Sequence, residues 1–156
     1  MTAVQTPFTR FDQVGMVVRD IDKAMETYRS LGLGPFSAFG NTAIVEKRVN
    51  GTIVPPDSIR AKIMMAKWGA IELEVIQPTA GNSPWQEFLD KHGEGVQHFG
   101  FFVDDINREE ERMVKQGYRL AYRSRFRNGD GAAYFDVGGM GGVMVELIQR
   151  APEYRL

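Results

Sequence analysis

The sequence predicts an α+β domain built from one βαβββ module that occurs twice. Three observations support this prediction: an internal repeat, an aspartate followed by a helical pattern in each copy, and three strand-like segments after each helix. The segment 13–21 aligns with the segment 98–106 at an offset of 85 positions. The same offset persists through a whole helix, because it also aligns Gly32 with Gly117.

The last strand of each copy is repeated at a different offset. The segment 73–77 matches 145–149 at an offset of 72, so the first copy carries 13 extra residues between its helix and its last strand. Most of these residues belong to 49–57. An insertion beside an open sheet is either a lid or specificity loop, or an exposed connection without a role.

The first module begins with a strand over about 13–19, which is rich in small and β-branched residues. Asp20 stands at the expected N-cap of a helix whose apolar residues recur at helical spacing up to Leu31, and Gly32 supplies the stop. Three strands follow, over about 36–48, 60–67 and 70–77.

The second module repeats this order after a linker helix. Ser83 is the expected N-cap of the linker helix, with Pro84 at its first position. In the second module, Asp104 or Asp105 caps the helix that ends at Gly117. Its strands are expected over about 97–103, 119–127, 131–137 and 142–149. We expect a single domain over 1–156, with module one at about 11–78, the linker helix at about 79–95 and module two at about 96–150.

Composition excludes several classes of protein. The 43% hydrophobic content argues against disorder, and a net charge of −1 without a charged block argues against binding to nucleic acid or to an anionic membrane. The chain has no cysteine, which excludes disulfides, thiolate nucleophiles and iron–sulfur ligation and suits a reducing cytosol. It also shows no signal peptide and no apolar run of the ~18 residues that a membrane-spanning helix needs. We therefore expect a cytoplasmic protein.

The repeat brings four possible metal ligands together. Two copies of one module are normally related by a pseudo-twofold axis, which makes Gln13 and His98 mates on the first strands and Glu74 and Glu146 mates on the last strands. Both glutamates lie in apolar runs. Burying a carboxylate there costs on the order of several kcal/mol unless a cation or hydrogen bonds satisfy it. We favour a metal site over the alternative that each is an ordinary strand residue. His92 is the only other histidine, so three histidines cannot form the site.

This order of residues resembles the vicinal oxygen chelate superfamily, which includes glyoxalase I, methylmalonyl-CoA epimerase, fosfomycin-resistance enzymes, bleomycin-resistance proteins and extradiol dioxygenases. The resemblance runs from about Phe11 to Gln149. Its most specific part matches the epimerase pattern DSP, FL and GEG(I/L)HH with two segments, Gly81-Asn82-Ser83-Pro84-Trp85 and Gly93-Glu94-Gly95-Val96-Gln97-His98. The resemblance implies one eight-stranded mixed sheet curved around a central metal site, and a homodimer. The ligands it implies are Gln13, Glu74, His98 and Glu146.

Two departures from the family pattern restrict the activities that the resemblance implies. Most relatives have His at the position of Gln13, although animal-type glyoxalase I is known for a Gln-Glu-His-Glu set. Gln13 argues against dioxygenase chemistry, which uses two His and one carboxylate on Fe(II). Epimerases tend to carry His-Pro-Lys before the last turn, where this chain has Phe135-Asp136-Val137-Gly138, so acyl-CoA specificity stays open.

The implied site suits one divalent metal, Zn²⁺, Co²⁺, Ni²⁺ or Mn²⁺, acting as a Lewis acid on a carbonyl oxygen. Glu146 is the expected base for the neighbouring C–H. A second base is Glu74 or Glu46; Glu46 resembles the position of an epimerase base but is otherwise an exposed charge before Lys47 and Arg48.

We therefore expect an isomerase, epimerase or lyase that acts on a small carbonyl compound, an acyl-CoA thioester or a hemithioacetal. Two alternatives stay open. A metal-free binding protein of the antibiotic-binding type would keep the fold without the ligands. A metal-dependent thiol transferase would keep the metal and add a thiol.

A row of arginines follows period two on one predicted strand and so shares one face. The row is either a solvated edge that discourages aggregation or a clamp for a substrate carboxylate or phosphate. In the second case Arg123 and Arg125 bind the substrate. The row consists of Arg119, Arg123, Arg125 and Arg127.

Overall fold

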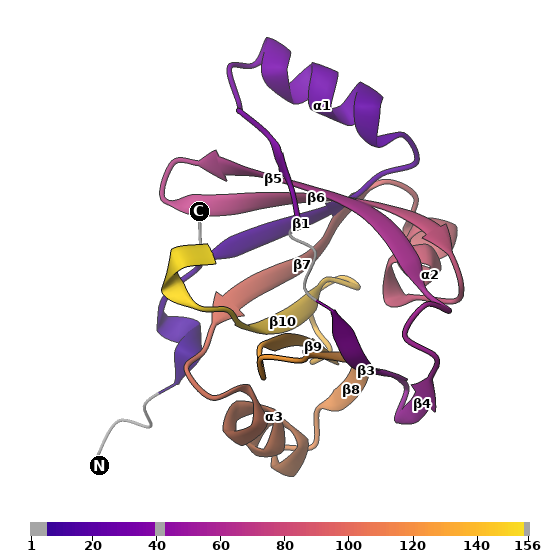
Figure 1. Ribbon diagram of the computed structural model, residues 1–156, viewed down its shortest axis with the longest axis vertical. Coiled ribbons are helices and arrows are strands. Elements are labelled where there is room, and N and C mark those ends of the chain that lie inside the picture. The colour runs from indigo at the N-terminus through magenta and orange to yellow at the C-terminus, as the bar shows by residue number, and fades with distance from the viewer. Residues whose placement is uncertain (1–5, 40–42, 155–156) are drawn as a thin grey trace.

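In the computed structural model, which describes residues 6–39 and 43–154, one mixed sheet curls around a central interior (Figure 1). The strands of the first module are β1 (Gln13–Val17), β2 (Ser37–Ala38), β3 (Ile44–Val49), β4 (Thr52–Val54), β5 (Arg60–Trp68) and β6 (Ile71–Ala80). Those of the second are β7 (Gly95–Phe102), β8 (Arg119–Phe126), β9 (Gly131–Asp136) and β10 (Met144–Gln149). The helices are α1 (Ile21–Ser30), α2 (Pro84–His92) and α3 (Ile106–Lys115), with short 3-10 turns η1 (Pro7–Thr9) and η2 (Pro152–Tyr154).

The strand order confirms the repeat. Along the sheet the order is β2-β5-β6-β1-β7-β10-β9-β8-β3-β4. The first strands of the two modules, β1 and β7, pair antiparallel at the centre, and each pairs in parallel with the last strand of its own module, β6 or β10. The fold class is therefore confirmed, with ten strands among the described residues in place of the expected eight.

The two additional strands arise in the first module. The strand expected over 36–48 is divided: β2 pairs with β5, whereas β3 pairs with β8 of the second module. The extra segment 49–57 supplies β4, which forms a hairpin with β3. Val49 and Val54 pack against the inner core, and the Lys47 ammonium donates to the carbonyl oxygen of Ile59 at 2.6 Å. The segment 49–57 thus contains a short strand that pairs with β3, and whether it also acts as a lid or specificity loop stays a prediction.

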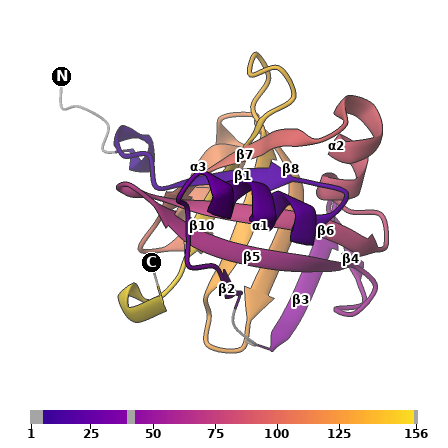
Figure 2. The ribbon, with the colours of Figure 1, turned by 90° about the horizontal axis from the view of Figure 1, so that it is seen from above.

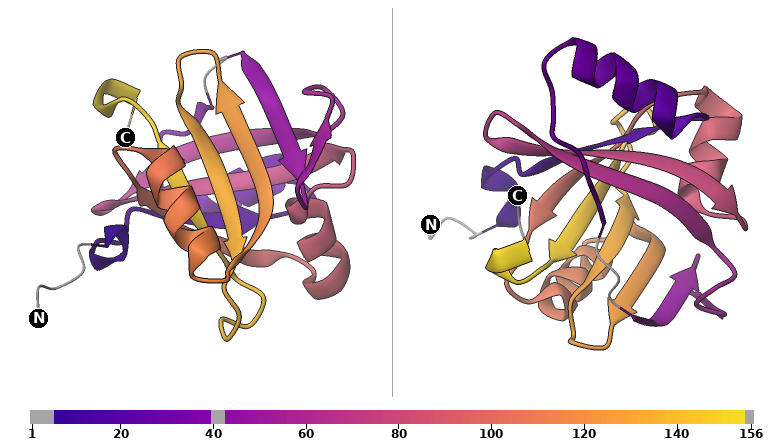
Figure 3. Two further views of the ribbon diagram at one scale, coloured as in Figure 1. Left: turned by 90° about the horizontal axis from the view of Figure 1, so that it is seen from below. Right: turned by 45° about the horizontal axis from the view of Figure 1, so that its top comes forward.

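Each module covers the outer face of its own strands with a helix. Figure 2 shows α1 lying across β1, β6 and β5, and the left view of Figure 3 shows α3 beside β9 and β8. Leu73 and Val75 point outward into the α1 cluster, and Val145 and Leu147 point outward into the α3 cluster. Burying a Leu or Val side chain contributes about 1.5–3 kcal/mol. The hydrophobic residues that stabilise the sheet thus leave its inner face for other side chains.

An inner cluster fills one end of that inner face. Trp85 of α2 packs against Tyr122 and Tyr134, with ring centroids 5.3 and 5.9 Å apart. Val17 and Ile76 complete the buried contacts at this end. The left view of Figure 3 also shows that the strands of the second module run nearly across those of the first. Polar residues on the remaining inner face are therefore enclosed by both halves of the sheet.

A bulge corrects the interpretation of the arginine row. The pairing of β8 with β9 shifts between Leu120 and Tyr122, so Leu120 packs toward α3 while Tyr122 packs into the inner cluster. Arg119 therefore faces differently from Arg123 and Arg125, and β8 lies between β9 and β3. The row does not share one face, and it does not form a solvated edge.

Aspartate caps open the helices of both modules. The Asp20 carboxylate accepts from the Lys23 amide at 3.1 Å, and the Asp105 carboxylate accepts from the Arg108 amide at 3.0 Å. Of the two candidates in the second module, Asp105 is therefore the cap. Within residues 6–39 and 43–154, no helix combines the length and apolar content that crossing a bilayer requires.

Replacing Asp105 by Ala should lower the free energy of unfolding by about 1 kcal/mol, because the Arg108 amide loses its acceptor at the start of α3. Urea denaturation followed by circular dichroism measures this loss. Asp104→Ala is the matched control, since Asp104 is an exposed neighbour that does not cap the helix. Equal losses in the two variants would contradict the assignment of the cap.

Candidate metal centre

The four residues expected as ligands meet on the inner face at the centre of the sheet. All of them are buried, with exposed fractions of 5% or less. The His98 Nε2 atom lies 3.1 Å from Gln13 Oε1, 3.2 Å from Glu74 Oε2 and 3.0 Å from Glu146 Oε2. One ligand atom each of Glu74, His98 and Glu146 lies within 4.8 Å of the others. The structure thus brings together all four side chains that the repeat placed near one another.

Glycines opposite two of these residues make room for them. In the pairing of β1 with β7, Gly15 is opposite His98 and Gly100 is opposite Gln13. A Cβ atom at Gly15 would lie 1.8 Å from His98 Cε1, and one at Gly100 would lie 2.8 Å from the Cβ of Gln13. The two glycines are themselves related by the repeat offset of 85. Both modules therefore use the same device, a missing side chain, to let a polar group into the interior.

Gln97 orients the imidazole. His98 Nδ1 lies 2.7 Å from Gln97 Oε1, and an amide oxygen can only accept, so Nδ1 carries a proton that it donates to Gln97. When the ring is neutral with its proton on Nδ1, Nε2 presents a lone pair to the interior, as in a metal-bound histidine. Gln97 itself is fully buried. The sequence analysis did not single it out, although it directly precedes His98.

Neighbouring charges perturb the pKa values of the cluster. Burial acts to lower the pKa of His98, but Glu146 and Glu74 more than offset it and raise this pKa to about 9. Burial raises the pKa of Glu146, against the opposite effects of His98 and of a hydrogen bond from Tyr134. Burial also raises the pKa of Tyr134, so its hydroxyl stays protonated and donates. The buried carboxylates of this centre thus stabilise a positive charge beside them.

A divalent metal would satisfy these four side chains better than they satisfy one another. One imidazole nitrogen faces three oxygen acceptors and has at most one proton to offer them. Glu74 Oε2 and Glu146 Oε2 are buried and lack a well-aligned hydrogen bond, although both lie within ion-pair distance of His98. A cation satisfies such oxygens. Three oxygens and one imidazole nitrogen suit Zn²⁺, Co²⁺, Ni²⁺ or Mn²⁺.

The structure does not bring Glu46, Arg123 or Arg125 to this cluster. Glu46 Oε1 lies 3.2 Å from Arg123 Nε, and both arginines form ion pairs with Glu110 of α3, at 3.1 and 2.5 Å. Arg125 also donates to Asn107 of α3. Successive strand residues point to opposite faces, so these side chains face α3 outside the sheet. The candidate bases at the cluster are therefore Glu74 and Glu146. Arg123 and Arg125 lie away from the cluster, and their role as a substrate clamp stays a prediction.

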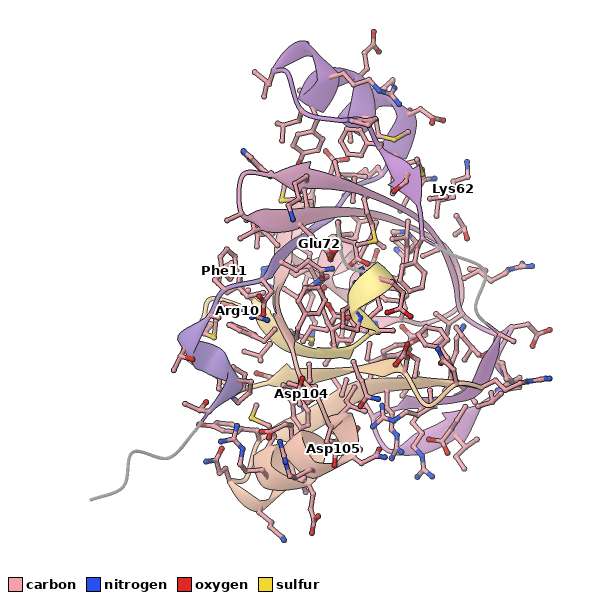
Figure 4. The ribbon with its side chains drawn as sticks, turned by 60° about the vertical axis from the view of Figure 1, so that its left-hand side comes forward. Arg10, Phe11, Lys62, Glu72, Asp104 and Asp105 are labelled. Atoms are coloured by element: carbon pink, nitrogen blue, oxygen red, sulfur yellow. The ribbon has the colours of Figure 1, made fainter. Side chains whose placement is uncertain are left out.

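Glu72 and Arg150 also lie at the centre, and the sequence analysis missed them. The Gln13 amide nitrogen donates to Glu72 Oε1 at 3.2 Å, and Arg150 Nη1 lies 3.2 Å from both oxygens of Glu72. Figure 4 shows Glu72 in the interior between the two halves of the sheet. Period two along β6 places Glu72 on the face of Glu74, which is a signal that could have found it. No comparable pattern marks Arg150.

The fold and the site together define a protein of paired βαβββ modules in which side chains that could hold a metal ion meet between the two modules. The chain belongs to the glyoxalase/bleomycin resistance protein/dioxygenase superfamily, whose family model matches residues 12–135. This match confirms the resemblance to the vicinal oxygen chelate superfamily.

Similar proteins agree with this membership. The uncharacterized protein YqjC of Bacillus subtilis (strain 168) is 27% identical over 143 residues, which cover 90% of this chain and 91% of that protein. Methylmalonyl-CoA epimerase from Mycobacterium tuberculosis is 28% identical with a TM-score of 0.63, covering 98% of this chain and 95% of that one. Streptomyces coelicolor methylmalonyl-CoA epimerase, in complex with 2-nitronate-propionyl-CoA, is 24% identical with a TM-score of 0.60, covering 91% and 97%. The fold is thus of the epimerase type.

Replacing Gly15 by Ala should displace the His98 imidazole, because the new Cβ atom overlaps the ring. Overpacking of this kind costs about 1–3 kcal/mol, and the displaced ring should also lose Zn²⁺ affinity. Thermal melting and Zn²⁺ titration measure the two effects. Met16→Ala alters a neighbour that faces α1, so it should lower stability without weakening Zn²⁺ binding. Wild-type Zn²⁺ affinity in the Gly15 variant would show that the glycine does not serve the site.

Proposed function

We propose that this protein is a divalent-metal-dependent isomerase, epimerase or lyase that removes a proton next to a carbonyl group. The observation that carries the proposal is the convergence of three buried oxygens on one imidazole nitrogen, with two of the oxygens lacking a well-aligned donor. Similarity to methylmalonyl-CoA epimerase supports the reaction type.

Gln13, Glu74, His98 and Glu146 would hold the cation, which is Zn²⁺, Co²⁺, Ni²⁺ or Mn²⁺. When bound, a divalent cation polarises a carbonyl oxygen and stabilises the negative charge that develops there. Gln97 keeps the imidazole in the tautomer that offers Nε2 to a cation. The inner cluster around Trp85 fills one end of the interior with buried side chains. The chain itself thus supplies a prearranged and buried set of donors.

Glu146 is the base in this proposal. Its carboxylate lies 3.0 Å from the ligand atom of His98, so it is close to any carbonyl compound held at the centre and can take the proton from the carbon next to the carbonyl. Tyr134 forms a hydrogen bond to the same carboxylate and holds its orientation. Glu74 lies on the pseudo-symmetric strand and approaches the same imidazole atom. A second carboxylate in this place returns the proton to another face or another carbon, as epimerisation and isomerisation require.

The substrate class in this proposal is a small oxygenated carbonyl compound, either an acyl-CoA thioester or a hemithioacetal. The similarity to methylmalonyl-CoA epimerase supports the first, and the Gln-Glu-His-Glu set supports the second. We also propose that the protein works as a homodimer in the cytoplasm, in keeping with the superfamily resemblance and with a chain that has no cysteine.

Purified protein should carry about one divalent metal per chain, as a single four-ligand site implies. Elemental analysis after chelator-free purification measures it. His98→Ala should cost more metal affinity than Gln13→Ala, because an amide oxygen is a weaker donor than an imidazole. A chain that holds no metal and takes up neither Zn²⁺, Co²⁺ nor Ni²⁺ would overturn the proposed function.

Glu146→Gln should lose about 10²–10⁴-fold in turnover, the usual contribution of a general base, while retaining much of its metal. An amide still offers an oxygen to a cation but cannot accept a proton at neutral pH. Methylmalonyl-CoA and the hemithioacetal of methylglyoxal are the substrates to assay, in D₂O as well as in water. Deuterium should appear on the carbon next to the carbonyl. Turnover without deuterium incorporation and without loss in the variant would exclude proton abstraction by Glu146.

A further inference from the structure

The amide of Gln13 has two chemically different ends, and the structure holds them in opposite directions. Its Oε1 atom lies 3.1 Å from His98 Nε2, inside the ligand cluster. Its Nε2 atom points away from the cluster and donates to Glu72 Oε1 at 3.2 Å. The opposite orientation would turn two N–H donors toward the cluster, where they could not bind a cation. The choice between these orientations therefore decides whether Gln13 is a ligand.

Glu72 favours the orientation in which the Gln13 amide oxygen faces the cluster. An ionised carboxylate only accepts hydrogen bonds, so it stabilises the amide nitrogen at its side and repels the amide oxygen. Arg150 Nη1 lies 3.2 Å from both carboxylate oxygens and donates to them, so Glu72 accepts hydrogen bonds on both sides. We propose that Glu72, with Arg150 behind it, is the positioning residue that sets Gln13 as an oxygen ligand. This inference rests on the proposed metal centre.

Arg150 is itself fixed from two sides. Its guanidinium carbon lies 5.4 Å from the ring centroid of Phe102 and 5.7 Å from that of Phe39. Only 10% of its side chain and 2% of the Glu72 side chain are exposed. Arg150 directly follows β10, Glu72 lies on β6 and Gln13 lies on β1. The chain of contacts therefore ties the segment after the last strand to the first ligand of the first module.

A role in stability alone explains the buried Glu72–Arg150 pair less well than a role in positioning Gln13 does. Replacing a buried ion pair by apolar residues of similar volume is often neutral or stabilising, so stability alone gives little reason to bury Glu72. Glu110 provides the comparison within the chain, since it is also buried and forms ion pairs with two arginines, but has no contact with a ligand. Of these two ion-paired carboxylates, Glu72 is the one that accepts a hydrogen bond from a residue of the cluster.

Titration with Co²⁺, followed by its visible absorption, tests the proposal on the full chain. Glu72→Gln should bind Co²⁺ about 10- to 100-fold more weakly than wild type, the usual effect of losing a group that orients a ligand. The absorption spectrum should also change, because the set of oxygen donors changes. Glu110→Gln is the matched control, since it removes a buried carboxylate from an ion pair far from Gln13 in the fold. It should keep the wild-type Co²⁺ affinity and spectrum.

The same substitution made in a Gln13→Glu variant distinguishes a role in orienting residue 13 from a general disturbance of the structure. In Gln13→Glu the ligand has two equivalent oxygens and needs no orienting partner, while Glu72 now repels it. Adding Glu72→Gln to that background should therefore leave Co²⁺ affinity unchanged or increase it. The effect of Glu72→Gln on Co²⁺ affinity should thus vanish or reverse when residue 13 is Glu. A purely structural role for Glu72 would give the same effect with either residue. Arg150→Met should also weaken Co²⁺ binding, and it provides the test if Glu72→Gln does not fold.

The outcomes are distinct. Wild-type affinity in both Glu72→Gln and Arg150→Met would overturn the positioning role and leave the metal centre intact. Equal losses from Glu72→Gln in the two backgrounds would overturn it as well, since the loss would not depend on the amide. A wild-type chain that binds no Co²⁺ and no other divalent metal would overturn the metal centre, and this inference with it.

Discussion

The antiparallel pairing of β1 with β7 is the constraint on which the rest of the structure depends. It sets Gly15 opposite His98 and Gly100 opposite Gln13, so each polar side chain enters the space that a glycine leaves. The parallel partners β6 and β10 then bring their glutamates to the same point from both sides. A shift of this register by one residue would turn every one of these side chains to the opposite face. The site is therefore a property of the strand pairing more than of any one module.

Hydrophobic and polar residues divide the work between the two faces of the sheet. The outer faces pack Leu73 and Leu147 under α1 and α3, and this burial supplies the free energy that folding needs. The inner face places two carboxylates and an imidazole beside one another, at an energetic cost that the surrounding core offsets. Function thus occupies the face that stability does not require.

The internal repeat was enough to predict the fold class and to bring Gln13, Glu74, His98 and Glu146 together, because equivalent positions in related modules meet at their axis. Alternation along β6 would also have shown Glu72 beside Glu74. Other features depend on long-range pairing that a single sequence does not show. The bulge in β8 redirects Arg119 relative to Arg123 and Arg125, and the pairing of β3 with β8 places Glu46 beside Arg123. Arg150 reaches Glu72 only because the sheet curls.

The placement of β3 has a further consequence. By sequence it belongs to the first module, but by hydrogen bonding it extends the second, where it covers the open side of β8. The second module cut from the chain would expose β8 as an unpaired edge, and the first module alone would carry a hairpin without its partner strand. Neither half is a complete folding unit, despite the symmetry of the repeat. The duplicated halves are interlocked, so they gain and lose their structure together.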